Sequence, residues 1–378
     1  MPKLSSSAGT RRSTFLSFQP PAVGEEEVAA VAETIRSGWL TSGPRVAELE
    51  RRMAEFLEAR HVLALSSGTA ALHLGLLAAG VGPGDEVITT SLSWPATANV
   101  ILHCGATPVF ADIRDGDLNV DPERVRELVG PRTRAILPVD LYGQPADLEP
   151  LLALGLPVVE DAAHAAEARY RGRKVGSIAH VTCFSLYATK NIAAGEGGLL
   201  ATDDDAIAQA VDDLRVMRRS HASLYDLVAP GFKANLSDVL ASIALVQLDK
   251  LERHRAIRER HFAAYDEAVA ELDGIEPVAR DPRDTHALHL YVVRVDPEVA
   301  GATRDDYRRA LAEEQIGTSV HFLPVHLLSA YRDRPHPPLP VTERAGAEVL
   351  SLPLSPAHTD DDIRDAIDAL RRVHARFA

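Results

Sequence analysis

The chain has 378 residues, of which 46% are hydrophobic and 25% are charged, and its formal net charge is −14. This composition excludes a chain that is disordered throughout, and no apolar run approaches the roughly 20 residues needed to cross a bilayer. The negative charge, with arginines scattered between acidic residues, argues against nucleic acid as the main partner. Two cysteines, Cys104 and Cys183, are too few for a disulfide framework or a metal cluster. Since the segment from Met1 to Arg12 also lacks an apolar signal core, we expect a cytoplasmic protein with no membrane partner.

Residues 1–17 are rich in serine and arginine, and we expect them to form a flexible arm. From about residue 60 to residue 205, short apolar runs alternate with polar or glycine-containing turns and with helix-like stretches. This rhythm is typical of an α/β domain with a mainly parallel sheet. It predicts seven strands, at residues 61–65, 86–90, 107–110, 135–141, 157–160, 181–185 and 198–202.

Polar or reactive side chains follow several of these strands at the point where each strand ends. They are Ser66 to Thr69 after the first strand, Trp94 after the second, Asp140 and Tyr142 after the fourth, Asp161 after the fifth and Ser185 after the sixth. In open α/β sheets the ligand binds outside the carboxyl ends of the strands. We therefore expect these residues to converge on one site.

After Gly231 the sequence changes to a long charged helix, expected over about residues 237–273, that would join two domains. The rest of the chain predicts a strand at 288–295, a helix at 304–314, a short strand at 318–322, a Pro-rich loop at 334–340 and a terminal helix at 360–376. We therefore expect a large domain over residues 18–250 and a smaller α+β domain over residues 251–378.

Lys190 is one of only five lysines in a chain that contains 35 arginines. A primary amine can form a Schiff base with a carbonyl cofactor, which a guanidinium cannot do. The alternative is an ordinary solvated loop lysine. The segment VVEDAAH at residues 158–164, upstream of Lys190, weighs against that alternative.

Asp161 closes a buried strand in that segment, where an unpaired carboxylate would be costly, so it needs a cationic partner. A protonated pyridine nitrogen could be this cationic partner. In pyridoxal phosphate chemistry, pairing with a carboxylate keeps the ring nitrogen protonated, so that the ring can accept electrons from the substrate. The amides and hydroxyls around Ser67 could bind the phosphate at a helix start, although an ordinary N-cap explains them as well. Trp94 could stack on a flat ring or pack in the core. His164 could hydrogen-bond a phenolic oxygen or be a buried structural histidine.

Six segments, in this order, resemble the DegT/DnrJ/EryC1/StrS family of sugar aminotransferases. They are SGTAAL at 67–72, GPGDEVI at 82–88, LYGQPAD at 141–147, EDAAHA at 160–165, SLYATKN at 185–191 with GEGG at 195–198, and GFKANLSD at 231–238. The similarity runs from about Phe18 to the C-terminus and includes SLPLSP at 351–356.

This resemblance implies a fold type I pyridoxal phosphate enzyme of the aspartate aminotransferase superfamily, with active sites built from both subunits of a homodimer. By motif position, Lys190 would carry the Schiff base and Asp161 would pair with the pyridinium, and these two would be the catalytic residues. The resemblance implies further cofactor contacts from Trp94 (ring stacking), His164 (phenolic oxygen), Gly68, Thr69 and Ser185 (phosphate) and Asn235 (the neighbouring subunit's phosphate).

Two positions depart from the family pattern. Asp140 stands where the family usually has histidine before Leu-Tyr-Gly, and Ser66 stands where asparagine or cysteine often precedes Ser-Gly-Thr. Asp140 could contact the substrate or support the site from behind, or it could have only a structural partner.

Candidate substrate residues lie in two segments. His321 and His326 resemble the family segment that approaches the sugar; a metal site is the alternative, but the proline between them and the lack of a nearby third ligand argue against it. Arg219 stands between Arg218 and His221 in a segment that could meet a diphosphate or be a solvated basic turn.

The segment around Asn235 is similar to that of family members that aminate the C4 ketone of nucleotide-linked sugars. The C3-aminating group more often shows Asn-Ser-Arg-Leu-Asp there. We therefore expect ping-pong amino transfer from glutamate or glutamine to an NDP-4-keto-6-deoxyhexose. The alternatives are C3 amination of a 3-keto sugar nucleotide, amination of a cyclitol ketone, a pyridoxal phosphate-dependent sugar dehydratase and a non-catalytic regulator. Lys190 argues against the dehydratase, because relatives with that activity have histidine in its place, and the intact Asp161 and Asn235 argue against the regulator.

Overall fold

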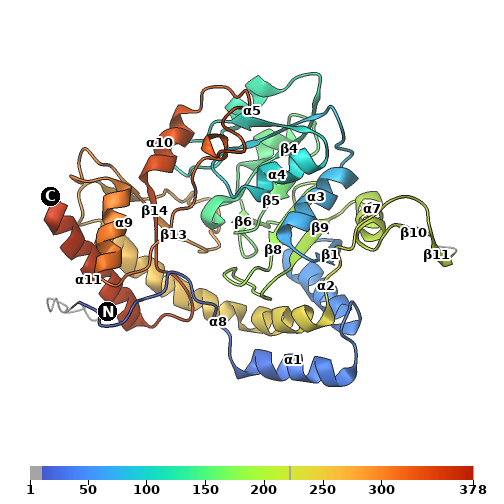
Figure 1. Cartoon of the computed structure of the whole chain (residues 1–378), viewed down its shortest axis with the longest axis horizontal. Coiled ribbons are helices and arrows are strands. Elements are labelled where there is room, and N and C mark those ends of the chain that lie inside the picture. The colour runs from blue at the N-terminus through green and yellow to red at the C-terminus, as the bar shows by residue number, and fades with distance from the viewer. Residues whose placement is uncertain (1–10, 221–222, 378) are drawn as a thin grey trace.

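The structure, a computed structural model, describes residues 11–220 and 223–377, and for residues 219–220 and 223–225 it describes the backbone alone. One long helix, α8 (Asp238–Val269), runs beneath both parts of the molecule (Figure 1). The boundary predicted at residue 250 falls inside this helix, so the division into residues 18–250 and 251–378 stays a prediction. No helix in the described part of the chain has an apolar stretch long enough to span a bilayer.

A seven-stranded sheet forms the centre of the larger part, as the sequence predicts. Its strands are β1 (His61–Leu65), β2 (Glu86–Thr90), β3 (Thr107–Ala111), β4 (Thr133–Leu137), β5 (Val159–Asp161), β8 (Val181–Ser185) and β9 (Gly198–Thr202). The pairings give the order β3-β2-β4-β5-β8-β9-β1, in which parallel bridges from Ile136 to Val158 and from Val139 to Asp161 join β4 to β5. Strand β9 is antiparallel to both of its neighbours and the other pairs are parallel, which confirms a mainly parallel sheet.

Strand β4 ends at Leu137, earlier than the predicted residue 141. Pro138 has no N–H group and cannot continue the ladder. The chain nevertheless keeps its direction, because the Asp161 N–H donates to the Pro138 carbonyl (2.9 Å) and the Asp140 N–H donates to the Asp161 carbonyl (3.0 Å). Asp140 is therefore fixed beside Asp161 at the carboxyl edge of the sheet.

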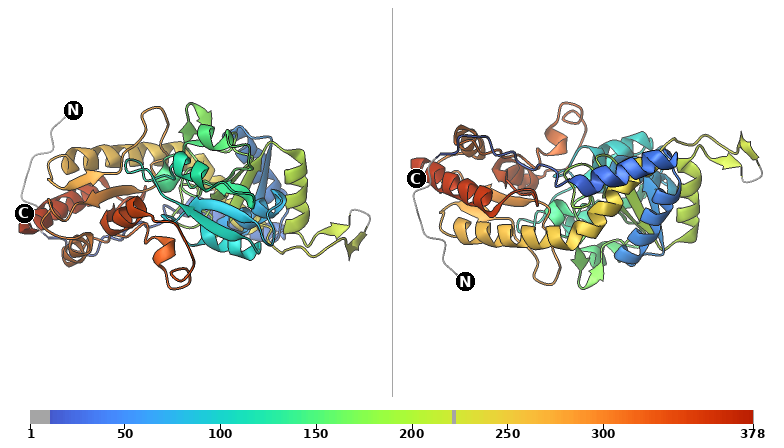
Figure 2. Two further views of the ribbon diagram at one scale, coloured as in Figure 1. Left: turned by 90° about the horizontal axis from the view of Figure 1, so that it is seen from above. Right: turned by 90° about the horizontal axis from the view of Figure 1, so that it is seen from below.

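Helices cover both faces of the sheet, and the alternation of apolar residues along the strands explains why. In β1, Leu63 and Leu65 pack with α3 (Gly68–Ala78), α4 (Ala96–His103) and α7 (Asp205–Arg215), whereas Val62 and Ala64 pack with α2 (Pro44–Leu57) and the first half of α8. Near β3, α5 (Pro122–Leu128) and α6 (Leu148–Leu152) enclose a further apolar cluster. Helix α1 (Glu25–Ser37) lies along α8, and its buried Glu27 pairs with Lys250 at 2.8 Å (Figures 1 and 2).

The smaller part is an antiparallel sheet covered by helices. Its strands are β12 (Ile275–Pro277), β13 (Tyr291–Val295) and β14 (Val349–Leu352), and its helices are α9 (Arg304–Glu313), α10 (Pro340–Glu348) and α11 (Asp360–Phe377). The second half of α8 shares a core with this sheet through Tyr265 and Val269. Of the predicted arm, Leu16 is buried against Ile316, and Arg12 pairs with Asp362 and Asp365. Two short hairpins, β6 (Arg169–Tyr170) with β7 (Arg173–Lys174) and β10 (Arg219–Ser220) with β11 (Ser223–Leu227), complete the fold, and the second projects from the body (Figure 2).

The prediction of a strand at 318–322 is wrong, because these residues do not form a regular strand. Only Ser319 pairs, in a bridge with Ser351. Beyond it the chain leaves the sheet, because the Tyr142 hydroxyl takes the His321 carbonyl as its acceptor and Pro324 has no N–H to donate. The departure carries His321 toward the carboxyl edge of the large sheet.

The start of helix α8 explains part of the GFKANLSD segment. The Asp238 carboxylate is fully buried and accepts hydrogen bonds from the backbone N–H groups of Gly43 (2.7 Å), Arg45 (3.0 Å) and Val46 (3.0 Å). These N–H groups belong to the start of α2, where no intrahelical acceptor is available. Asp238 therefore caps one helix from the first turn of another.

We expect Asp238→Ala to lower the free energy of unfolding by at least about 3 kcal/mol, since it leaves three N–H groups without their charged acceptor. The matched control is Asp249→Ala, which removes an exposed carboxylate of the same helix that pairs with Arg52 and should cost less than about 1 kcal/mol. Urea denaturation of the two variants and the wild type measures both effects. Equal midpoints for the two variants would contradict the capping role.

Candidate active site

Lys190 lies in a closed loop between β8 and β9, which we call the lysine loop (residues 186–197). Backbone hydrogen bonds join its two ends, from the Leu186 N–H to the Gly197 carbonyl (2.9 Å) and from the Ala188 N–H to the Gly195 carbonyl (3.0 Å). The side chain of Lys190 is largely removed from water, and this burial lowers the pKa of its amine to about 8, against the opposing attraction of Asp161. About a tenth of the amine is therefore neutral at pH 7, far more than for a lysine with the ordinary pKa of 10.5.

Asp161 ends strand β5 and is held by two donors. The Thr97 hydroxyl of α4 donates to Oδ2 at 2.8 Å, and the Ala163 N–H donates to Oδ1 at 3.2 Å. Burial raises the pKa of the Asp161 carboxyl, while Thr97, Ala163 and the charge of Lys190 act in the opposite direction. Because a buried carboxylate is stabilised by a nearby cation, this position favours a positively charged group in front of it.

Three histidines surround the amine of Lys190, which acts on the charge of each of them. Burial first, and then Lys190, lowers the pKa of His164 and of His289 well below the ordinary value and that of His321 to about 4. All three are therefore neutral near neutral pH. The Tyr142 N–H donates to His164 Nδ1 at 3.2 Å, so the neutral His164 ring carries its proton on Nε2.

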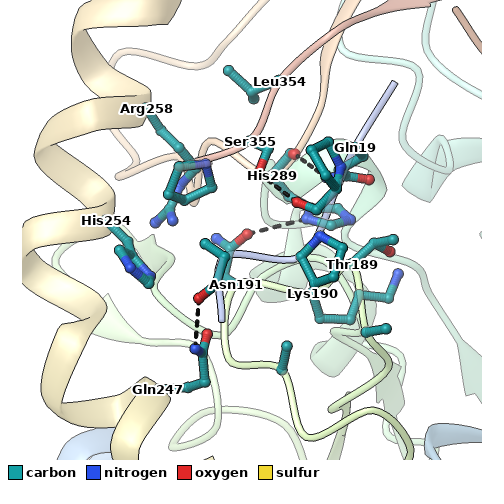
Figure 3. Close-up of a pocket in the computed structure, with 16 residues that line it drawn as sticks. Gln19, Thr189, Lys190, Asn191, Gln247, His254, Arg258, His289, Leu354 and Ser355 are labelled. Atoms are coloured by element: carbon teal, nitrogen blue, oxygen red, sulfur yellow. Dashed lines mark hydrogen bonds between the residues drawn. The ribbon is translucent and has the colours of Figure 1, made fainter. Parts of the chain in front are cut away.

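His289 is a site residue that the sequence analysis did not single out. Its ring lies 4.5 Å from that of His164 between centroids, and its Nδ1 lies 3.1 Å from Asn191 Oδ1 in the lysine loop (Figure 3). Its only signal in the sequence is a histidine within the apolar run 288–295. Asn191 also donates to Glu167 (2.7 Å) and to the Ala287 carbonyl (2.8 Å), so the loop is tied to the smaller part of the molecule.

The start of helix α3 forms a cradle beside Ser185. Ser67 caps the helix, accepting from the Ala70 N–H at 3.0 Å, and Thr69 is exposed in the first turn. A Cβ atom added to Gly68 would lie 3.1 Å from Ser185 Cβ, and one added to Gly198 would lie 2.3 Å from the Ser67 carbonyl oxygen. Glycine at these two positions lets strands β8 and β9 approach the helix start, where unpaired amides favour a phosphate.

The structure brings only some of the remaining candidates to Lys190. Trp94 follows β2 with 63% of its surface exposed, and its ring lies 6.1 Å from that of Phe322. His326 is buried, with Nδ1 at 2.7 Å from the Ser91 hydroxyl, and is not among the groups that act on Lys190.

Asn235 lies farther along, between the sheet and α8. Its amide donates to the Ser42 hydroxyl at 2.5 Å and its oxygen accepts from Lys233. Arg219 belongs to hairpin strand β10, and its side chain, like all of His221, lies outside the described residues. The proposed contacts of Asn235, Arg219 and the two histidines His321 and His326 stay predictions.

Comparison with known proteins gives a consistent result. The model of the DegT/DnrJ/EryC1/StrS aminotransferase family matches residues 21–371. The chain is 43% identical to the spore coat polysaccharide biosynthesis protein SpsC of Bacillus subtilis (strain 168), over 96% of this chain and 98% of SpsC. Its structure resembles the PLP form of Spr1654 from Streptococcus pneumoniae (TM-score 0.91, 31% identity, 96% of this chain and 100% of that one). It also resembles DesI in the presence of its TDP-sugar product (TM-score 0.90, 34% identity, 98% and 95%).

These similarities confirm the fold type I class, and the site fits pyridoxal phosphate. The cradle at Gly68 would hold the phosphate with Thr69 and Ser185, and Asp161 would pair with the protonated ring nitrogen. Lys190 would offer the amine for the carbonyl group, and His164, with its proton on Nε2, would donate to the phenolic oxygen. Each feature is present in the chain's own geometry, since the buried Asp161 requires a cation and the cradle requires glycine.

The lowered pKa of Lys190 predicts how its reactivity depends on pH. In the cofactor-free protein, the rate at which a neutral amine-reactive reagent labels Lys190 should rise about tenfold per pH unit and level off above about pH 8, because only the neutral amine reacts. Mass spectrometry of the labelled peptide follows the rate. The control is the same lysine in the urea-unfolded chain, whose rate should keep rising toward the ordinary pKa of 10.5. A folded-state rate that also rises through pH 10 would contradict the assigned pKa.

Proposed function

The chain belongs to the DegT/DnrJ/EryC1/StrS family of pyridoxal phosphate-dependent sugar aminotransferases, and from this premise we propose that it transfers an amino group from glutamate or glutamine to C4 of a nucleotide-linked 4-keto-6-deoxyhexose in the cytoplasm. The observation that carries amino transfer is the half-buried amine of Lys190, whose pKa is lowered to about 8 and which Asp161 attracts. The form of segment 231–238 supports C4 over C3. The similarity to DesI, whose structure was solved with its TDP-sugar product, supports a nucleotide-linked sugar.

Lys190 performs two tasks in this function. Its neutral form is the one that would attach to the carbonyl carbon of pyridoxal phosphate with release of water, and the pKa of about 8 keeps a fraction of the amine in this form near neutral pH. The same Nζ, when not attached to the cofactor, would hold the proton that moves between two carbons during amino transfer, since a pKa near the working pH favours both taking and returning it. When bound, pyridoxal phosphate supplies the carbonyl that carries the amino group and a ring that delocalises the electrons left by the departing proton.

The surrounding residues fix the charges that this proton transfer needs. The Thr97 hydroxyl and the Ala163 N–H favour the ionised form of Asp161, which would stabilise a positive ring nitrogen. His164 is held with its proton on Nε2 by the Tyr142 N–H, so it donates rather than accepts on that side. His289 and His321 stay neutral near neutral pH. Among these groups, Lys190 is therefore the base that gains and loses a proton near the working pH.

Amination at C4 is tested with matched substrates. Purified enzyme, pyridoxal phosphate and glutamate are incubated with a nucleotide-linked 4-keto-6-deoxyhexose, with the corresponding 3-keto sugar and with a cyclitol ketone. We expect product only, or by far the fastest, from the 4-keto sugar, with the new nitrogen located on C4 by NMR. Lys190→Arg should lose turnover by at least about 10³-fold, because its guanidinium does not release a proton near neutral pH.

The outcomes separate the alternatives. Faster amination of the 3-keto sugar or the cyclitol would replace the C4 proposal while keeping the activity. A Lys190→Arg variant with wild-type turnover would contradict the role of Lys190. Release of a dehydrated sugar without consumption of glutamate would identify the dehydratase.

We further propose that two copies of the chain share each active site, with Asn235 of one subunit serving the phosphate of the other. Lys190→Arg and Asn235→Ala are each expected to be nearly inactive alone. Refolded together, random mixing makes half of the dimers hybrids, in which one of two sites combines an intact Lys190 with an intact Asn235. Activity should then recover to about a quarter of the wild-type value. No recovery from a mixture that forms dimers by light scattering would contradict the shared site.

A further inference from the structure

Two buried carboxyl groups, Asp140 and Glu160, lie directly behind the cofactor-facing Asp161. Both side chains are fully buried, and each lies within hydrogen-bonding reach of the other. Asp140 follows β4 and Glu160 is in β5, the two strands that meet at the carboxyl edge of the sheet. Nothing in the proposed chemistry uses either group.

Each carboxyl has one oxygen with a donor and one without. Asp140 Oδ1 accepts from the Ala146 N–H at 2.9 Å, and Glu160 Oε2 accepts from the Thr182 hydroxyl at 2.8 Å. Within the part of the chain that the structure describes, Asp140 Oδ2 and Glu160 Oε1 have no hydrogen-bond donor. An ionised carboxylate only accepts hydrogen bonds, so two ionised groups in contact would repel, whereas one proton between them satisfies both remaining oxygens.

The charges around the pair favour keeping that proton. Among the largest influences on either carboxyl, the charged groups are the partner carboxyl and Asp161, which are both acidic. Cys183 of β8 faces the same charges, and burial with the two neighbouring carboxyls, Asp161 and Glu160, raises the pKa of its thiol well above the ordinary value, so it stays neutral. Lys190 acts on Asp161 and is not among the largest influences on either carboxyl of the pair.

We propose that Asp140 and Glu160 share one proton and that this pair positions Asp161 for its contact with the cofactor. The link is the backbone: the Asp140 N–H donates to the Asp161 carbonyl, and the Asp161 N–H donates to the Pro138 carbonyl. With the proton in place, the pair carries one negative charge and a hydrogen bond that holds the ends of β4 and β5 together. Without it, two buried negative charges would push these ends apart.

The two pKa shifts agree with this arrangement. Burial and then the charge of Asp161 raise the pKa of Glu160 to about 7, while its contact with Asp140 acts in the opposite direction, as expected if Asp140 holds the proton. Burial and then Glu160 raise the pKa of Asp140 well above its ordinary value. The folded protein then holds one more proton than the unfolded chain between the ordinary carboxyl pKa and the raised one. The free energy of unfolding must therefore fall as pH rises through this window.

The first test is spectroscopic and uses the holoenzyme without substrate. Infrared spectra near neutral pH should show the carbonyl band of a protonated carboxyl group that is absent from Asp140→Asn and from Glu160→Gln. The surface variant Asp249→Asn should keep the band. No sugar or amino donor is present, so a spectrum without the band would contradict the shared proton and not the proposed amino transfer. The positioning role itself rests on the proposed contact between Asp161 and the cofactor.

The second test separates positioning from a merely structural role. Asp140→Asn supplies an N–H in place of the shared proton, so it should bind pyridoxal phosphate as tightly as the wild type. In the wild type, the equilibrium constant for unfolding should change by up to tenfold per pH unit between about pH 5 and about pH 7. The Asp140→Asn variant should not show this change. Asp140→Ala leaves buried groups unpaired and should weaken pyridoxal phosphate binding about tenfold or more.

If Asp140→Ala does not fold, the two amide variants still decide the matter. A wild-type spectrum without the protonated band, or an Asp140→Asn variant with the same pH dependence of unfolding as the wild type, would overturn the shared proton. An Asp140→Ala variant that folds and binds pyridoxal phosphate like the wild type would overturn the positioning role.

Discussion

The site depends on one electrostatic constraint, which is that a carboxylate and an amine are buried at the same edge of the sheet. Burial favours the neutral form of both groups, since it raises the pKa of Asp161 and lowers that of Lys190. The charge of each group opposes the pKa shift of the other. The result is an amine that titrates near neutral pH and a carboxylate that Thr97 and the Ala163 N–H help to keep ionised. An exposed lysine or an exposed aspartate would have neither property.

Close packing of the backbone makes this arrangement possible. The lysine loop follows β8, and Gly68 and Gly198 let the start of helix α3 lie against β8 and β9. The phosphate cradle and Lys190 therefore share one strand, β8, whose last residue is Ser185. Because β5 is the parallel neighbour of β8, Asp161 ends at the same edge.

The sequence predicted what depends on local pattern and missed what depends on distant contacts. The seven strands follow from apolar runs between turns. Asp161 and Ser185 are singled out by their place at strand ends, and Lys190 by its rarity among 35 arginines; their contacts with the cofactor stay predictions. Thr97 reaches Asp161 across 64 residues of sequence, and Asp238 reaches Gly43 across 195, so no pattern near either residue reveals its role. Likewise, His321 and His326 look equivalent in the sequence, yet the first lies near Lys190 and the second is buried against Ser91.

The alternation of side chains along β5 explains why a buried acid pair lies behind the site. Successive strand residues face opposite sides of a sheet, so a β5 that directs Asp161 toward the cofactor directs Glu160 away from it. The sheet is covered on both faces, so Glu160 has no route to water and needs a partner within the protein. A basic partner would have neutralised Glu160 by charge; Asp140 can do so only by sharing a proton. A shared proton adds no positive charge behind Asp161, so the attraction between Asp161 and a cationic ring is not weakened from behind.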